Sequence, residues 1–303
     1  SPTPYDESFN PNPGWTYWDT TSKRFFATLE HAFANDWKVK IGATHDKTTA
    51  DDKLFYPAYN DWATGASLLD KDTGAGVSPS AGFYNTERQV DGVDGFVEGP
   101  FQLFSREHQF MAGLSYNKRD YANRGDYQVA WAPLTNYPVG IGNFPQPNWA
   151  DTLPLQSEGT ITQKAGYAAA RLSLADPLKL ILGARHTDWE STGEGADRSH
   201  TVTTPYAGLV FDINDTYSTY ASYTEIFQPQ TARDVNDNYL DPVDGKAYEV
   251  GVKGAWFEDR LNASLAVFRI EQDNVAQVTS IPILTRPGEF APIAARGTVS
   301  RGF

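Results

Sequence analysis

A regular alternation of apolar and polar residues runs through AYEVGVKGAWFEDRLNASLAVFRIEQDN, residues 247–274. Tyr248 and Val250 have one parity, whereas Glu249 and Lys253 have the other. Because successive side chains of a β-strand point to opposite faces of its sheet, this period of two predicts strands with one apolar and one polar face. A soluble sheet buries its apolar face in a core, whereas an outer-membrane barrel exposes that face to lipid and keeps small or polar residues on the lumen side.

The same alternation recurs along the chain. It is clear in residues 24–30, 37–44, 110–117 and 178–187, and weaker in residues 160–174, 200–213 and 217–227, which we also interpret as strands. The pattern predicts about eleven strands in all, each of about ten residues. That length exceeds the usual five or six residues of strands in soluble sheets. It is the length that a tilted membrane-crossing strand requires.

The connections between these strands alternate between short and long. Short turns are predicted at AND (34–36), FSREH (104–108), ADP (175–177), NDT (214–216) and EDR (258–260). Long loops are predicted at 51–85, 122–156, 190–199, 228–246 and 273–296. All short turns of such an antiparallel meander fall on one side and all long loops on the other. This asymmetry is typical of outer-membrane barrels, which have periplasmic turns and extracellular loops.

Composition excludes several classes of protein. The 303 residues contain no cysteine, which excludes a disulfide scaffold, a cysteine nucleophile and a cysteine-bound metal. A net charge of -13 argues against a nucleic-acid partner, because nucleic acids bind basic surfaces. No apolar run reaches the length of a membrane helix. The chain begins at Ser1 and contains one methionine, so we expect it to be a piece of a longer precursor.

Several stretches resemble the barrel of TonB-dependent siderophore receptors. YASYTEIFQPQ (220–230) matches a strand that ends in Tyr-Thr-Glu-x-Phe, and residues 240–274 match the following Leu-x-Pro and Tyr-Glu-x-Gly-x-Lys. The closing TVSRGF, the stretch SKRFFATLEHAFANDWKVKIGATHD and the stretch LADPLKLILGARHTDW are similar to other strands of these barrels. The resemblance therefore extends over nearly the whole chain, with the long loops as its variable parts.

The resemblance implies an all-β fold, in which an antiparallel transmembrane meander contributes about eleven strands to a 22-stranded, plugged barrel. We expect residues 1–303 to be an internal fragment of the barrel domain that lacks the plug domain and the TonB box, so that the fragment alone would be inactive. The implied protein is a multi-pass receptor and active transporter of the Gram-negative outer membrane. Its implied partners are a ferric siderophore, the TonB complex (reached through the missing N-terminal part), outer-membrane lipid and lipopolysaccharide. Heme, cobalamin or a sugar remains open as the cargo.

Aromatic residues of the two longest predicted loops are the candidate ligand contacts, since such receptors hold a bulky complex in an aromatic vestibule. The candidates are Tyr56, Tyr59 and Trp62 in the first loop and Trp131, Tyr137, Phe144 and Trp149 in the second. Arg124 is added because its guanidinium can donate charge-assisted hydrogen bonds to chelating oxygens. The alternative for each ring is packing between loops or anchoring in the membrane girdle. Girdle anchoring is expected for the tryptophans beside strand ends, namely Trp15, Trp18, Trp37, Trp189 and Trp256.

Other functions have weaker support. DVNDNYLDPVDG (234–245) resembles a calcium loop, but it has Tyr239 at the position of the required glycine and Gly245 at that of the final glutamate. The five histidines lack the spacing of a zinc site, so no metal, no bound cofactor and no catalytic residue is predicted. A soluble carbohydrate-active or carbohydrate-binding all-β protein would explain the aromatics and the acidity. It would not explain the strand lengths or the alternating loop lengths. A passive porin is a further, weaker alternative.

Overall fold

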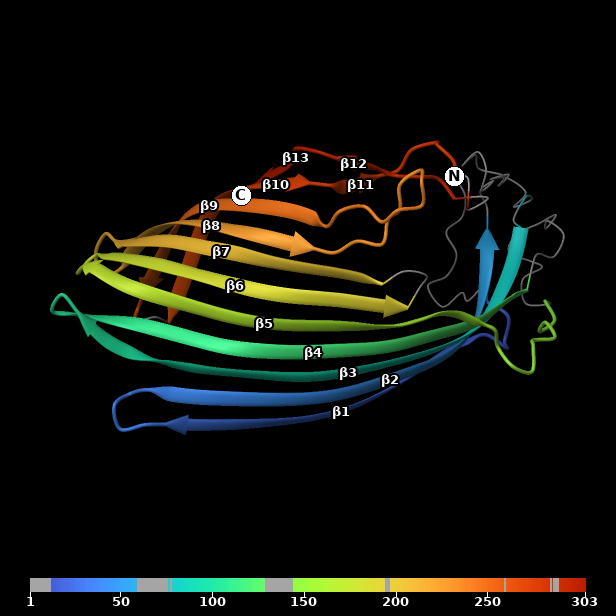
Figure 1. Cartoon of the computed structure of the whole chain (residues 1–303), viewed down its shortest axis with the longest axis horizontal. Helices are drawn as coiled ribbons and strands as arrows, with labels where there is room; N and C mark the ends of the chain where they lie inside the picture. Colours follow the sequence, from blue (N-terminus) through green and yellow to red (C-terminus); the bar gives the residue numbers. More distant parts are fainter. Residues whose placement is uncertain are drawn as a thin grey trace.

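The computed structural model of the chain is an antiparallel meander (Figure 1). It describes residues 12–58, 76, 78–128, 144–193, 197–258, 260–283, 285 and 289–303. Eleven strands form one sheet in the order β1 (Tyr17–Ala32), β2 (Lys38–Ala58), β3 (Ser78–Leu103), β4 (Arg106–Gln128), β5 (Leu155–Ala175), β6 (Leu178–Gly193), β7 (Arg198–Asp212), β8 (Tyr217–Gln228), β9 (Val243–Trp256), β10 (Leu261–Asp273) and β13 (Thr298–Gly302). The strands β11 (Val275–Gln277) and β12 (Ile293–Ala295) pair separately. All five predicted short turns are at one end of the sheet, here called the short-turn end, opposite the long-loop end (Figure 1).

The register of the sheet separates its side chains into two chemically different faces. Ile41 on β2 pairs with Gly95 on β3, and Gly95 pairs with Leu114 on β4, so the three residues form one row across the sheet. This row belongs to the apolar face, here called the outer face. The neighbouring row of paired residues places Lys40 on the same face as Tyr167 and Arg185, and this polar face is called the inner face. The predicted parity of these strands is therefore confirmed in the pairing of neighbouring strands.

Strand length differs from the sequence prediction. Strands β2, β3 and β4 contain 21, 26 and 23 residues, instead of about ten. The predicted loops 51–85 and 122–156 are correspondingly shorter, because their first and last residues continue the strands. At about 3.3 Å per residue, β3 is roughly 85 Å long, which exceeds the thickness of a bilayer even when the strand is tilted. In the predicted barrel, the parts of these strands nearest the long-loop end would therefore extend beyond the membrane.

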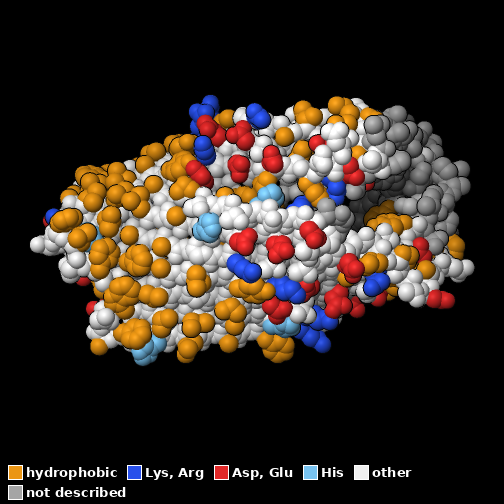
Figure 2. All heavy atoms as spheres, in the orientation of Figure 1, with side chains coloured by type: hydrophobic (Ala, Val, Ile, Leu, Met, Phe, Trp, Pro, Cys, Tyr) orange, Lys and Arg blue, Asp and Glu red, His pale blue; other side chains and the backbone are white. Residues whose placement is uncertain are grey.

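The outer face has no protein layer against it. Leu114, Leu265 and Val250 are 73%, 69% and 54% exposed, and six hydrophobic side chains are buried in the part of the chain that the structure describes. A soluble all-β protein would bury such a face in its core. Hydrophobic side chains gather toward the short-turn end of this face and charged side chains toward its middle (Figure 2). The soluble carbohydrate-binding alternative is therefore not supported. No helix among the described residues is long and apolar enough to cross a membrane.

Tyrosines of the inner face lie across glycines of neighbouring strands. A Cβ atom at Gly113 would come within 2.5 Å of the Tyr167 ring, and one at Gly251 within 2.6 Å of the Tyr220 ring. Tyr167 also donates a hydrogen bond to Asp94 at 3.0 Å. The missing side chains at these glycines therefore allow the rings to lie flat along the inner wall, where they cover backbone that would otherwise face the lumen.

The assignment of faces predicts unequal effects of two changes on β9. Val250→Arg would place a charge on the outer face and should cost roughly 2 to 4 kcal/mol near the middle of the bilayer. Lys253→Leu changes the inner face, so barrel assembly should be retained. Heat-modifiable migration of the outer-membrane protein on gels measures assembly. Equal assembly of both variants would contradict the assigned faces.

Candidate functional site

Three arginine side chains lie on the inner face in the long-loop half of the sheet. Arg88 is on β3, Arg119 is on β4, and Arg198 begins β7. Arg24, on the same face, pairs with Asp46 at 2.8 Å. Within the described residues, the other three arginines form no ion pair with a carboxylate. These three guanidinium groups therefore form no direct ion pair with the described part of the wall, although Asp46 lies near enough to Arg88 for a Coulombic attraction.

A cluster of three tyrosines lies on the inner face nearer the loops. The hydroxyl groups of Tyr56 and Tyr84 are 3.2 Å apart. The rings of Tyr84 and Tyr127 meet edge to face, with centroids 5.2 Å apart. Tyr127 is 61% exposed, so its ring is free to contact a molecule in the lumen. These rings come from three adjacent strands, β2, β3 and β4.

A stack of alternating rings and guanidinium groups fixes the loop between β8 and β9 to the inner wall. Arg198 lies 5.4 Å from the Trp189 ring centroid and 4.1 Å from that of Tyr239, and Arg233 lies 3.7 Å from the Tyr239 centroid. Arg198 also donates to the carbonyl of Gln230 at 2.7 Å. The Nε of Arg198 is buried and has no hydrogen-bond partner in the described part of the chain. The stack therefore holds the loop while one guanidinium donor stays unused.

A hollow of about 340 Å³ lies beside this stack. It is lined by Asn117, Arg119, Ile161, Gln163, Trp189, Arg198, Pro229 and Thr231. Two guanidinium groups, two carboxamides and an indole ring thus face one space. Such a lining can donate several hydrogen bonds to anionic oxygens and can stack on a planar group.

Hydrogen bonds within the β8–β9 loop explain the stretch that resembles a calcium loop. The Asp234 carboxylate accepts from the backbone N–H groups of Asn236 and Asn238, each at 2.9 Å. These bonds, above all the one from Asn238, lower the pKa of Asp234. Asp237 pairs with Arg233 at 3.3 Å. These carboxylates therefore shape the loop, and the described residues contain no group of three or more histidine or acidic side chains placed to hold a metal ion.

The sequence candidates are distributed over both faces. Tyr56 belongs to the tyrosine cluster of the inner face. Arg124 is exposed, and it pairs in register with Asn85 on the outer face. Tyr59, Trp62, Trp131 and Tyr137 lie outside the described residues.

Phe144 and Trp149 belong to an aromatic cluster on the outer face. The Phe144 ring centroid is 5.2 Å from that of Phe55, and the Trp149 centroid is 5.9 Å from that of Phe83. Trp15 contacts Trp149 at 6.3 Å between centroids and donates a hydrogen bond to the Phe144 carbonyl at 2.9 Å. In the described structure these rings pack the segment before β5 against the upper parts of β2 and β3.

The expected membrane girdle is also only partly present. Trp256 contacts Tyr217 on the outer face near the short-turn end, where a girdle residue should lie. Trp189, for which the sequence predicts the same role, is 8% exposed and stacks on His200 on the inner face. Its odd-numbered position on β6 gives it the parity of Arg185, which decides the face irrespective of its place near the strand end.

Sequence reasoning missed Arg88, Arg119 and Arg198 as site residues. Arg88 follows the parity of Phe96 along β3, and Arg119 follows that of Gly113 along β4. The signal was therefore the unbroken parity of each strand. This signal is weak at these arginines because the residues around them are polar on both faces, a pattern that also fits the edges of loops.

Comparisons with known proteins agree with this architecture. A family model described as "TonB dependent receptor-like, beta-barrel" matches residues 1–303. The "Ferric-pyoverdine 358 receptor" of Pseudomonas putida is 32% identical over 99% of this chain and 37% of its own length. The "Ferripyoverdine receptor" of Pseudomonas aeruginosa is 35% identical over 89% of this chain and 32% of its own length. The chain thus spans about a third of the length of these relatives.

A solved structure confirms the match in three dimensions. The crystal structure of the ferripyoverdine receptor of the Pseudomonas aeruginosa outer membrane, bound to ferripyoverdine, superposes with a TM-score of 0.83 at 30% identity. The superposition covers 97% of this chain and 39% of that one. The meander described above is therefore part of an outer-membrane barrel, and the chain belongs to the β-barrel family of TonB-dependent receptors.

Proposed function

We propose that this chain forms part of the wall of an outer-membrane receptor that binds and imports a ferric siderophore. The observation that supports this most is the group of three inner-face arginines, Arg88, Arg119 and Arg198, which form no direct ion pair among the described residues. Arg119 and Arg198 also lie beside aromatic rings. Relatives named as ferric-pyoverdine receptors point to the same class of ligand. Iron in this proposal is cargo, held by the siderophore and not by protein ligands.

The chemistry of the inner face fits such a ligand. Ferric siderophores present chelating oxygens with negative charge, and guanidinium groups donate strong hydrogen bonds to such oxygens. Arg119 lies 5.9 Å from the Tyr121 ring centroid, so cation and ring are presented together. The exposed ring of Tyr127 adds a surface for an aromatic or planar part of the ligand. The β8–β9 loop covers one side of this space.

Energy coupling in the proposed receptor depends on other parts of the protein. The resemblance implies that the TonB complex acts through a TonB box and a plug domain, and that this barrel segment supplies only wall and vestibule. In this proposal residues 1–303 bind and enclose the ligand, without a catalytic step.

The first prediction concerns affinity, measured with ferripyoverdine and the purified receptor that contains this segment. Arg119→Gln should weaken binding by about tenfold or more, because one charge-assisted hydrogen bond contributes roughly 1.5 to 3 kcal/mol. Arg124→Gln is a matched control, since Arg124 lies five residues further along β4 but on the outer face. The Arg124→Gln receptor should bind ferripyoverdine with the affinity of the unmodified receptor. Equal losses in both variants, or no loss in Arg119→Gln, would contradict the assignment of the ligand to the inner face.

The second prediction concerns the β8–β9 loop. Arg198→Lys keeps the positive charge but loses the planar group that stacks between Trp189 and Tyr239. The loop should then be cleaved faster by a protease added to the assembled receptor. Arg260→Lys is the control, because Arg260 is an exposed residue of a short turn. Identical cleavage rates in the loop for both variants would show that the stack does not hold it.

A further inference from the structure

The hollow beside the β8–β9 loop is small for a ferric siderophore. Its volume of about 340 Å³ is at the lower end of the ~300–1,000 Å³ range of pockets that enclose a drug-sized ligand. A ferric siderophore is a bulky complex, so the hollow can admit one arm of such a ligand but not the whole complex. The hollow is therefore suited to a group at the periphery of the ligand, outside the iron shell.

The lining of the hollow contains two cations and no acid. Arg119 belongs to β4 and Arg198 to β7, and no aspartate or glutamate is among the lining residues. Neither arginine forms an ion pair in the described structure. Asp241 and Asp244 lie near enough to His200 for a Coulombic attraction, but neither lines the hollow. The lining therefore carries two positive charges and no negative charge.

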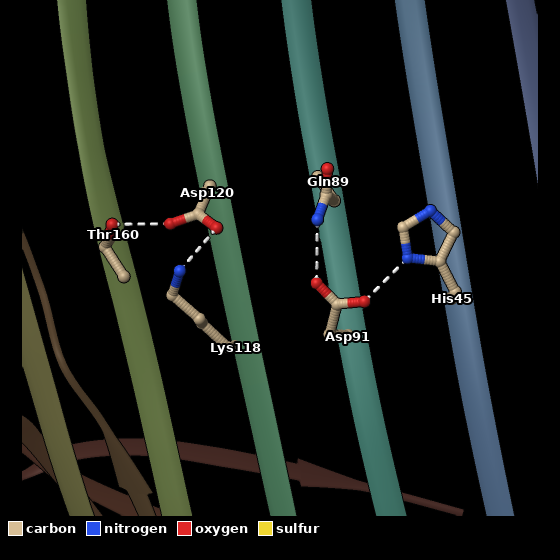
Figure 3. A network of polar contacts seen from close by, with 6 residues as sticks. All are labelled: His45, Gln89, Asp91, Lys118, Asp120 and Thr160. Atoms are coloured by element: carbon tan, nitrogen blue, oxygen red, sulfur yellow. Dashed lines mark hydrogen bonds and ion pairs between the residues drawn. The ribbon is translucent and has the colours of Figure 1, made fainter.

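The carboxylate nearest to Arg119 in sequence lies on the other face of the wall. Lys118 and Asp120 flank Arg119, have outer-face parity and pair with each other at 2.7 Å (Figure 3). The hydrogen bonds and ion pairs of this outer network extend from β2 to β5, through His45, Gln89, Asp91, Lys118, Asp120 and Thr160 (Figure 3). Because Arg119 has the opposite parity, its guanidinium lies on the inner face, away from this network.

Arg198 is held in place with one donor unused. Its guanidinium lies 5.4 Å from the Trp189 ring centroid and donates to the Gln230 carbonyl at 2.7 Å. Its Nε is buried without a hydrogen-bond partner in the described part of the chain, which is costly unless a ligand supplies an acceptor. Pro229 and Thr231, on either side of Gln230, line the hollow. The loop segment that anchors this arginine therefore also forms one wall of the hollow.

The remaining lining fits a planar acid on a short stem. A guanidinium presents its donors in a planar fork that matches the two oxygens of a carboxylate. Asn117 and Gln163 offer amide N–H donors, and the Trp189 indole offers a flat surface for packing. Ile161 and Pro229 add apolar surface for a short hydrocarbon stem.

We propose that this hollow is a subsite for a free carboxylate at the end of one siderophore arm, a group that does not ligate the iron. The inference rests on the siderophore function proposed above, and it narrows the contact of Arg119 and Arg198 to the oxygens of this arm. An arm that ends in a neutral amide leaves both guanidinium groups without an anion. The hollow therefore discriminates between siderophores by the charge of this arm.

Two matched ligands test the subsite. One is ferripyoverdine with a free carboxylate outside the iron shell, and the other is the same complex with that carboxylate converted to its primary amide. Calorimetric titration of the purified receptor that contains this segment should show about tenfold tighter binding of the acid than of the amide, because only the acid forms charge-assisted hydrogen bonds with the arginines.

Gln163→Glu places a negative charge in the hollow and keeps both arginines. This variant should bind the acid and the amide with about equal affinity. Gln272→Glu is the matched control, because Gln272 also lies on the inner face near the long-loop end, but on β10 and outside the hollow. It should keep the preference for the acid. Heat-modifiable migration checks assembly, and Asn117→Asp makes the equivalent change from β4 if Gln163→Glu does not assemble.

The outcomes separate this subsite from the siderophore function. Equal binding of the acid and the amide by the unmodified receptor would overturn the subsite and leave the siderophore function standing. An equal loss of preference in Gln272→Glu would also overturn it, because that result describes general repulsion across the lumen. Binding of neither form would instead contradict the siderophore function. Titration with benzoate and benzamide then decides whether the hollow binds a carboxylate, since a carboxylate site should prefer benzoate and lose that preference in Gln163→Glu.

Discussion

Backbone pairing between adjacent antiparallel strands is the constraint on which every other feature of this chain depends. A lipid bilayer offers no hydrogen-bond partners, so each N–H and C=O group within it must pair with a neighbouring strand. Once that pairing is fixed, alternate side chains must face lipid and lumen, and a shift by one residue would reverse every face. The register of the strands therefore determines which side chains lie on the outer face and which on the inner face.

This constraint explains how much of the fold could be predicted from the sequence. The eleven strands, their order and the five short turns follow from apolar alternation, which is strong wherever one face meets lipid, as at Val39 or Val250. The signal disappears beyond the membrane, because both faces of a strand are then polar. For this reason the sequence predicts loops over about a third of β2, β3 and β4, at their long-loop ends. The short strands β11 and β12 both lie inside the predicted loop 273–296.

The residues predicted as ligand contacts do not lie on one surface. The sequence predicts ligand contacts at aromatic residues of the long loops, whereas Phe144 and Trp149 pack on the outer face through contacts that no local pattern encodes. Tyr56 lies in the inner-face tyrosine cluster because it continues the parity of β2. The inner-face arginines follow the same parity, so they could have been found by extending each strand through its polar part.

The glycines of the wall differ in what covers them. On the inner face Gly113 and Gly251 lie under tyrosine rings, which close the wall toward the lumen. On the outer face Gly95 and Gly166 lie under open space, which leaves a hollow toward the lipid. Register alone does not decide this, because Gly254 on the outer face lies under the Trp256 ring and Gly42 on the inner face lies under open space.

Spin-label accessibility along β4 tests the central claim, the alternation of lipid and lumen faces, most directly. Labels at Leu114 and Ser115, placed singly in the receptor in bilayers, should differ: the first should be accessible to oxygen dissolved in lipid and the second should not. A label at Asn117, on the inner face, should become less mobile when ferripyoverdine is added. Equal oxygen accessibility at Leu114 and Ser115 would contradict the two-faced wall on which the proposed ligand site rests.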